Sequence, residues 1–194
     1  LLADARGRYT EYALLRLAAL DNERRDHAAA LAWLDRLAKE FPEGVLADRA
    51  ALGRGYALYK LGRSTEADGV LNGLLKHPQL GVDAHYWLGM SQFSREAWQE
   101  AAATFAAGAV IDSQHRWNET LSYQAACALL NDGQFGQAAA QFDRVLERWP
   151  KTAWAEACWL GKLQAAAAQN DHAAVVRMAG ELAAKFPAGA HLSE

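Results

Sequence analysis

The chain has 194 residues, of which 52% are hydrophobic and 22% charged, and its formal net charge is −3. These values are ordinary for a folded domain. The basic residues are scattered, with Arg24-Arg25 as the only adjacent pair, which argues against a nucleic-acid partner or a membrane-surface patch. No apolar run approaches the ~20 residues of a membrane helix, so we expect no direct membrane insertion. The chain starts at Leu1, and we expect it to be a piece of a longer protein.

Helices are predicted along the whole chain, in five antiparallel pairs. No segment alternates apolar and polar residues for long enough to suggest a strand, so we predict no sheet. In chain order, the predicted helices span residues 8–20, 26–40, 45–60, 64–76, 82–94, 97–110, 117–131, 135–148, 152–168 and 172–185.

The helix pairs follow a period near 36 residues. The four prolines, Pro42, Pro78, Pro150 and Pro187, are separated by 36, 72 and 37 residues. Segments 26–42 and 171–187 agree at eight of seventeen positions, including Asp-His at the start and Phe-Pro at the end. Such self-similarity indicates a helical repeat array. We predict one array over 1–194, with units 7–42, 43–78, 79–114, 115–150 and 151–187.

Three columns of residues recur in these units. A small side chain lets two antiparallel helices approach closely, and a large apolar residue four positions further on fills the core on the same helical face. The first helices carry the small residues Ala18, Gly55, Gly89, Ala126 and Gly161. The second helices carry the small residues Ala30, Ala67, Ala101, Ala138 and Ala174, followed by Leu34, Leu71, Phe105, Phe142 and Met178.

The ends of the helices are also marked. Asp26 and Asp171 are predicted N-caps. Gly62 and Gly133 can adopt a positive φ between paired helices, and Asn22 and Asn170 are the expected substitutes. The third turn, Ser94-Arg95-Glu96, is the weakest. Each proline disfavours helical geometry in the preceding residue and is expected to end the second helix there.

These columns resemble the tetratricopeptide repeat, whose pattern includes A-x3-F and a terminal proline. Here A-x3-F is found from Ala101 to Phe105 and from Ala138 to Phe142, and four of the five units end in proline. The resemblance implies an all-α, right-handed α-solenoid. The phrases AHYWLG and EACWLG are similar to bacterial envelope members, such as the periplasmic cell-division coordinator of the Tol–Pal system. That likeness favours the periplasm or cell envelope over the cytoplasm.

The resemblance also implies that the first helices line a concave groove for a protein or peptide partner. Exposed Tyr, Phe and Met are suited to holding an apolar segment, although they can equally serve packing between repeats or be covered by a longer array. Members that bind chaperone tails use Lys and Asn at positions occupied here by residues such as Leu52 and Tyr86, so we expect no such binding. The candidate residues are Arg49, Leu52, Tyr56, Tyr59, Asp83, Tyr86, Met90, Phe93 and Tyr123.

The sequence does not suggest an enzyme. The six histidines fall in no metal-binding spacing, and Asp83 and His85 do not face each other on a helix. Cys127 and Cys158 are offset along neighbouring first helices by about 6 Å, too far for an easy disulfide. We therefore predict no catalytic residue, metal or cofactor. Trp117 and Trp154, which open first helices, leave sugar binding as a minor option.

A structural role is the alternative to peptide binding. Terminal repeats that cap an array usually have a polar outer face. The first and last predicted helices, with YALLRLAAL and VVRMAGELAAKF, lack it. This pattern favours a spacer or self-assembly segment of a larger envelope or scaffold protein, which would self-associate through its terminal repeats.

Overall fold

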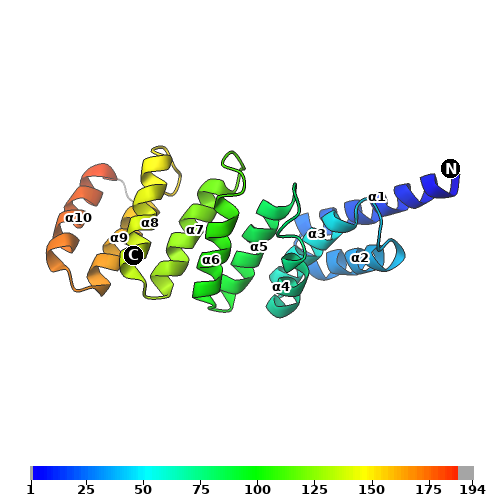
Figure 1. Ribbon diagram of the computed structural model, residues 1–194, viewed down its shortest axis with the longest axis horizontal. Helices are drawn as coiled ribbons and strands as arrows, with labels where there is room; N and C mark the ends of the chain where they lie inside the picture. Colours follow the sequence, from blue (N-terminus) through cyan, green and yellow to red (C-terminus); the bar gives the residue numbers. More distant parts are fainter. Residues whose placement is uncertain (1, 188–194) are drawn as a thin grey trace. The chain divides into compact units, whose positions relative to one another are not determined.

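The computed structural model describes residues 2–187, and this part of the chain is helical with no strand, as predicted (Figure 1). The tail after Pro187, including His191, lies outside the described residues. The helices in this part are α1 (Leu2–Glu23), α2 (His27–Glu40), α3 (Ala47–Lys60), α4 (Ser64–Asn72), α5 (Gly81–Ser94), α6 (Trp98–Ala109), α7 (Asn118–Asn131), α8 (Phe135–Arg148), α9 (Ala155–Ala168) and α10 (His172–Lys185).

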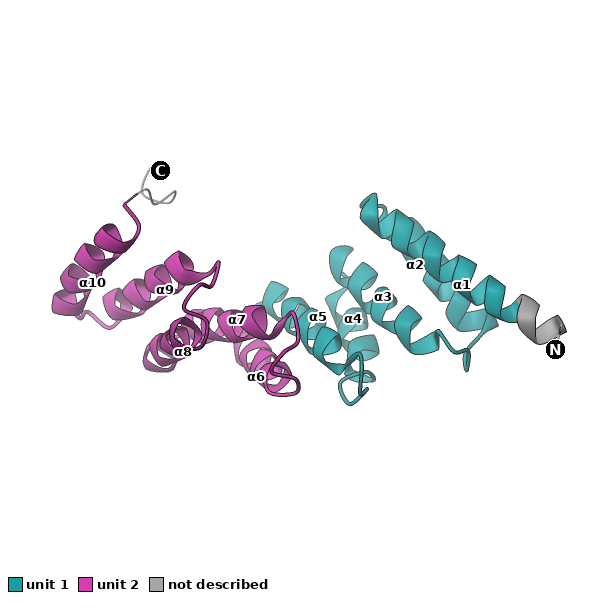
Figure 2. Ribbon diagram, turned by 90° about the horizontal axis from the view of Figure 1, so that it is seen from above, with its two compact units in different colours: residues 1–97 teal, residues 98–194 magenta. Residues whose placement is uncertain are grey.

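The helices fall into two compact units, residues 1–97 and 98–194 (Figure 2). Unit 1 holds α1 to α5 and unit 2 holds α6 to α10. Within each unit every helix packs against the next, and the alternate helices α1, α3 and α5 also contact in turn, as do α7 and α9. In unit 1 the odd-numbered helices therefore form one layer, as expected of the first helices in a tetratricopeptide-like solenoid.

The small-residue columns are buried as predicted. A Cβ atom added to Gly55 would lie 2.5 Å from Cγ of Leu71 on α4, and one added to Gly161 would collide with the ring of Phe142 on α8. Gly55 thus faces the second helix of its own pair, whereas Gly161 faces the second helix of the preceding pair. The large apolar column is buried except at Met178 on α10, which is half-buried.

Most predicted caps and turns are confirmed. The carboxylates of Asp26 and Asp171 accept hydrogen bonds of 3.0 Å from the backbone N–H groups of Ala29 and Ala174. Gly62 and Gly133 have φ of 74° and 77°, and Asn170 has 58°.

The first and third turns show one wrong prediction and one unusual residue. Asn22 is not the turn residue, because α1 continues to Glu23 and Arg25 takes the positive φ of 63°. In the third turn, Glu96 adopts a φ of 62°.

The predicted end of the fourth helix at residue 76 is also wrong. The helix ends at Asn72, well before Pro78. Gly73, a poor helix former, follows directly, and the chain continues in tight turns such as the bond from Leu74 N–H to Leu71 C=O, 3.0 Å. Where a proline follows the helix at once, after Phe41, Trp149 and Phe186, the helices end as predicted.

Candidate peptide-binding face

Four aromatic side chains gather on the α3–α5 layer of unit 1. The ring of Trp87 on α5 lies between Tyr56 and Tyr59 of α3 and its own neighbour Tyr86, with centroids 4.5, 6.0 and 4.7 Å away. We call these residues the Tyr–Trp cluster. All four are half-buried, so each keeps some surface exposed to solvent. Three of the nine predicted site residues are therefore brought together around a residue that was not predicted.

The predicted groove positions lie three before and one after the small residue of each first helix, which for Gly89 are Tyr86 and Met90 and leave Trp87 out. The available signal was the phrase Trp87-Leu88-Gly89, in which the tryptophan stands beside the leucine. A helix residue two positions before the small column lies at the edge of the packed stripe. There a large ring can reach the preceding first helix, as Trp87 does.

Two further side chains complete this face. The Lys60 ammonium, at the end of α3, lies 5.8 Å from the Tyr56 ring centroid and 5.3 Å from that of Tyr59. The His27 ring, at the start of α2, meets Tyr56 edge to face at 5.7 Å, and its Nδ1 donates to Asn22 Oδ1 at 2.9 Å. The bond to Asn22 gives this histidine a structural role in the first turn of α2.

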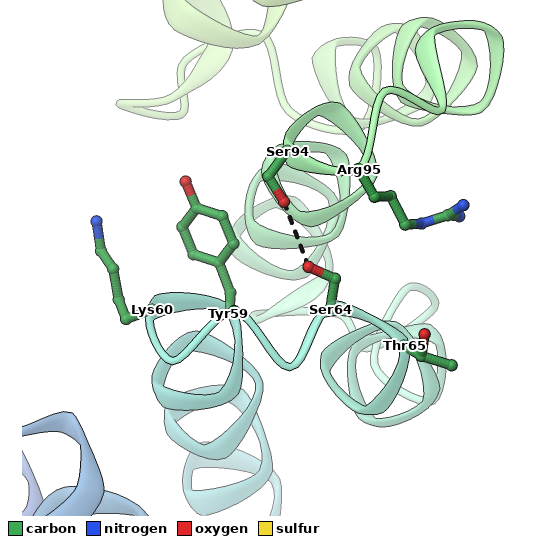
Figure 3. A pocket seen from close by; sticks show the side chains of 7 residues that line it. Tyr59, Lys60, Ser64, Thr65, Ser94 and Arg95 are labelled. Carbon is green, nitrogen blue, oxygen red and sulfur yellow. Dashed lines mark hydrogen bonds between the residues drawn. The ribbon is translucent and has the colours of Figure 1, made fainter.

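Lys60 separates two hollows in unit 1. The larger, about 570 Å³, is bordered by Tyr59, Ser64, Ser94 and Arg95, and the other, about 480 Å³, by Arg25, His27 and Tyr56. Figure 3 shows Tyr59 and Lys60 pointing to the same side of the larger hollow. The hydrogen bond of 3.3 Å between the Ser64 and Ser94 hydroxyls lies between this pair and Arg95. The guanidinium of Arg95 pairs with Asp68 at 3.2 Å.

The electrostatics of this face favour uncharged rings beside one cation. Burial raises the pKa of Tyr59 and of Tyr86 above 10.0. Burial, followed by the positive charges of Lys60 and Arg25, lowers the pKa of His27 below 6.5. Near neutral pH the tyrosines and the histidine are therefore uncharged. Lys60 provides a cation in direct contact with the aromatic rings.

The other predicted residues of unit 1 lie on the same two helices. Leu52 on α3 is half-buried against the hydrophobic core of the unit, and Arg49 is exposed one turn earlier. On α5, Asp83, Met90 and Phe93 are half-buried.

Tyr123 belongs to unit 2, where its ring packs inside the unit. It stacks on Trp154 with centroids 4.5 Å apart and planes 10° apart, and it lies 6.0 Å from the Phe142 ring. Burial raises the pKa of Tyr123 as well. Tyr123 therefore serves packing between α7, α8 and α9, and Trp154, a candidate for sugar binding, is half-buried beneath it.

The part of the chain that the structure describes shows little reactive chemistry. Cys127 and Cys158 are free thiols, and burial raises their pKa to about 11 and about 12. No group of three or more His, Cys, Asp or Glu side chains among the described residues could hold a metal ion. None of the described helices is long and apolar enough to span a bilayer.

Comparison with known proteins agrees with this geometry. The tetratricopeptide repeat family model matches residues 23–75, 52–115 and 123–187. No curated protein sequence matches the chain.

Several solved structures have a similar fold. A crystal structure of MamA protein has a TM-score of 0.77 at 13% identity, with 92% of each chain covered. MamA from Desulfovibrio magneticus has 0.74 at 16% identity, over 89% of this chain and 93% of that one. A tetratricopeptide repeat protein from Parabacteroides merdae has 0.77 at 14%, over 93% of this chain and 68% of that one. At these identities the similarity shows the fold alone. The family model, however, covers well over half of the sequence, and the chain belongs to the tetratricopeptide repeat family.

Proposed function

We propose that the α3–α5 face of unit 1 binds a segment of a protein partner. Tetratricopeptide repeats generally mediate protein–protein interactions, and in this chain the Tyr–Trp cluster is the feature suited to that task. Half-buried aromatic rings held by their neighbours lose little conformational freedom on binding and offer large apolar contact areas. The cluster itself is the observation that carries the proposal.

The chemistry of the face suggests what the segment contains. An aliphatic or aromatic side chain would pack on the exposed part of the cluster. A carboxylate would pair with Lys60, whose ammonium contacts two rings but has no carboxylate partner among the described residues. A cation next to aromatic rings and two hollows supports an anionic group at this point of the partner.

Affinity capture from the source organism tests the proposal. The bait is the 194-residue chain, compared with a variant carrying Tyr56→Ala and Tyr86→Ala. A matched control carries Tyr9→Ala and Tyr12→Ala, which removes two tyrosines that are 77% and 63% exposed on α1. Circular dichroism first establishes that all three baits are folded.

We expect one or more proteins to be retained by the parent and the control but lost with the cluster variant. Truncation of an aromatic anchor commonly weakens binding by about 2 kcal/mol or more, roughly thirtyfold, which is enough to abolish capture. If both variants capture the same proteins as the parent, the cluster serves only packing between α3 and α5.

The compartment follows from the same experiment. We propose a place in the bacterial cell envelope, on the similarity of AHYWLG and EACWLG to envelope members of the family, including the Tol–Pal cell-division coordinator. Capture is therefore made separately from soluble and envelope fractions. A partner found only in the cytoplasmic fraction would contradict this assignment.

A second candidate function is self-association through the terminal helices. Val176 on α10 is 75% exposed. On α1, Leu17 is also exposed, at 40%. Sedimentation at increasing protein concentration tests this function. A monomer at all concentrations would contradict it, and a loss of association in a Leu17→Ser/Val176→Ser variant would support it.

A further inference from the structure

A second surface, on unit 2, carries features that peptide binding at the Tyr–Trp cluster does not use. A hollow of about 250 Å³ lies where α6, α7 and α8 meet, with Ala106, Val110, Val145 and Trp149 in its wall. A neighbouring hollow of about 410 Å³ continues along Trp149, Pro150 and Lys151. Arg148 and Trp149 border both. We call the two together the Trp149 surface.

The Trp149 surface exposes apolar side chains. Val110, directly after α6, is 81% exposed and lines the smaller hollow, and Ile111 beside it is 49% exposed. Trp149 is half-buried, with the Arg148 guanidinium 4.7 Å from its ring centroid. Neighbouring exposed aliphatic residues at the rim of a hollow are typical of a binding surface rather than of a solvated helix face.

Three cationic side chains lie around these apolar side chains and have no carboxylate partner among the described residues. Arg144, Arg148 and Lys151 are all exposed, and none forms an ion pair among the described residues. Arg144 donates a hydrogen bond of 3.2 Å to the Gln141 amide oxygen.

Three acids lie near these cations, and none forms an ion pair with them among the described residues. Glu119 on α7, which lines the larger hollow together with Arg148 and Lys151, accepts a hydrogen bond from Thr152, and Asp112 after α6 accepts one from the backbone of Gln114. Glu147 on α8 is exposed. The three exposed cations are therefore open to carboxylates of a partner.

Two of the other repeats place opposite charges at the same two positions. In α2 the equivalents of Arg144 and Arg148 are Arg36 and Glu40, which form an ion pair of 2.6 Å. In α10 the equivalents are Glu181 and Lys185. Like charges four residues apart destabilise a helix, whereas opposite charges stabilise it. Only α8 among these three helices departs from the stabilising arrangement, and it does so beside the exposed apolar hollow.

The corresponding hollow of unit 1 does not share this property. It measures about 270 Å³ and is lined by Leu34, Ala38, Pro42 and Arg54. There the guanidinium of Arg54 pairs with Asp35 at 2.6 Å. A hollow at this place is thus a general consequence of packing between repeats, but unpaired cations around it are particular to the Trp149 surface.

We propose that the Trp149 surface is a second docking site, and that its occupant is an acidic amphipathic segment of a protein. A large apolar side chain of the partner enters the hollow beside Val110 and Trp149. Two carboxylates about one helical turn apart pair with Arg144 and Arg148, and a third can reach Lys151. The match is one of charge and of spacing, because the two arginines are themselves one turn apart.

Polyanionic partners fit this surface less well. Nucleic acid binding depends on many phosphate contacts along a basic stripe, and a membrane surface requires several basic residues around a broad apolar face. The Trp149 surface has only three cations around a concave hollow, and the chain as a whole has a net charge of −3. A peptide with one anchor and a few carboxylates uses all of these features.

Selection from an unbiased displayed peptide library tests the proposal. The target is the full chain carrying Tyr56→Ala and Tyr86→Ala, so that peptides recognising the Tyr–Trp cluster are not enriched. We expect enriched peptides with a large apolar residue and at least two carboxylates three or four positions apart. Their affinities are then measured by fluorescence anisotropy at several salt concentrations.

Two double variants separate local from general electrostatics. Arg144→Gln/Arg148→Gln should weaken binding by about tenfold or more and reduce its dependence on salt. Arg16→Gln/Arg177→Gln removes the same charge from exposed positions on α1 and α10 and should leave the affinity within about twofold.

Three outcomes would overturn the proposal. The first is a selection that enriches no acidic peptide. The second is equal weakening of binding by both double variants. The third is binding of phosphatidylserine vesicles or a short DNA duplex through Arg144 and Arg148 when no peptide binds. The library target lacks two tyrosines of the Tyr–Trp cluster, so a failed peptide selection does not bear on the proposed function of unit 1. A failed affinity capture with the cluster variant likewise does not bear on the Trp149 surface.

Discussion

Gly55→Ala should destabilise the chain, whereas Gly69→Ala should stabilise it, although both replace a helical glycine in unit 1. A Cβ at position 55 would lie 2.5 Å from both Cγ and Cδ2 of Leu71, a side chain with no exposed surface. At position 69 on α4 an added Cβ meets no atom within 4 Å. The pair therefore isolates the contact from the general benefit of alanine over glycine.

The magnitudes follow from two opposing effects. Alanine is favoured over glycine in a helix interior by about 1 kcal/mol, and this gain applies to both substitutions. At position 55, Leu71 or the helix must move by roughly 1 Å, and overpacking of this kind typically costs about 1–3 kcal/mol. We expect a net loss of about 0–2 kcal/mol for Gly55→Ala and a gain of about 1 kcal/mol for Gly69→Ala.

Urea unfolding followed by circular dichroism measures the difference. The midpoints should move in opposite directions, or at least differ clearly, while the slopes stay the same. Combining Gly55→Ala with Leu71→Ala should show a coupling free energy of about 0.5–3 kcal/mol, because the second change removes the group that the first one meets. Equal stabilisation by both glycine substitutions would refute the close approach of α3 and α4 at this point.

Three further outcomes are expected. At about pH 8 the thiols of Cys127 and Cys158, with pKa raised to about 11 and about 12, should react with a thiol reagent at least about a hundredfold more slowly in the folded chain than in urea, and equal rates would contradict their burial. The pKa of His27 in the folded chain lies below 6.5, so as the pH falls the unfolded chain binds a proton at this histidine before the folded chain does. The free energy of unfolding should therefore decrease as the pH falls from about 6.5 towards the folded pKa, and it should decrease less steeply in His27→Gln. Thermal unfolding at a series of pH values measures this difference. Asp26→Ala should lower the free energy of unfolding by about 1 kcal/mol in urea titrations, because the carboxylate caps the backbone N–H of Ala29 at the start of α2, and an unchanged stability would contradict this role.

Much of the fold could be predicted because the same local determinants of helix packing, capping and turning recur in several repeats of the sequence. The buried small residues, the N-caps at Asp26 and Asp171 and the glycines at 62 and 133 each follow from contacts within a few residues or within one helix pair. The wrong predictions are also local. Asn22 was expected to turn the chain, but α1 gains one more turn and Arg25 accepts the positive φ. Gly73 ends α4 before the proline can act.

The candidate site was less predictable, since it depends on which side chains of neighbouring first helices reach each other. Counting positions from the small column placed Tyr56, Tyr59 and Tyr86 on one face, and the structure brings them together. The same counting could not show that Trp87 would bridge them, because a ring at the edge of the stripe is placed by the neighbouring helix and not by its own.

Comparison between repeats of one chain separates packing from function more sharply than burial alone. Helices at equivalent positions of the repeat pack against equivalent neighbours. For this reason α2, α8 and α10 are each followed by an aromatic residue, Phe41, Trp149 and Phe186. A position where one repeat departs from the others against its own stability needs another cause. The paired arginines of α8 are such a departure, because α2 and α10 place opposite charges there. This departure is chemical and calls for a carboxylate partner, whereas the exposure of Val176 on the terminal helix is geometric and calls only for a covering helix. The Trp149 surface and the end of α10 should therefore respond to different perturbations, salt for the former and apolar-to-polar substitution for the latter.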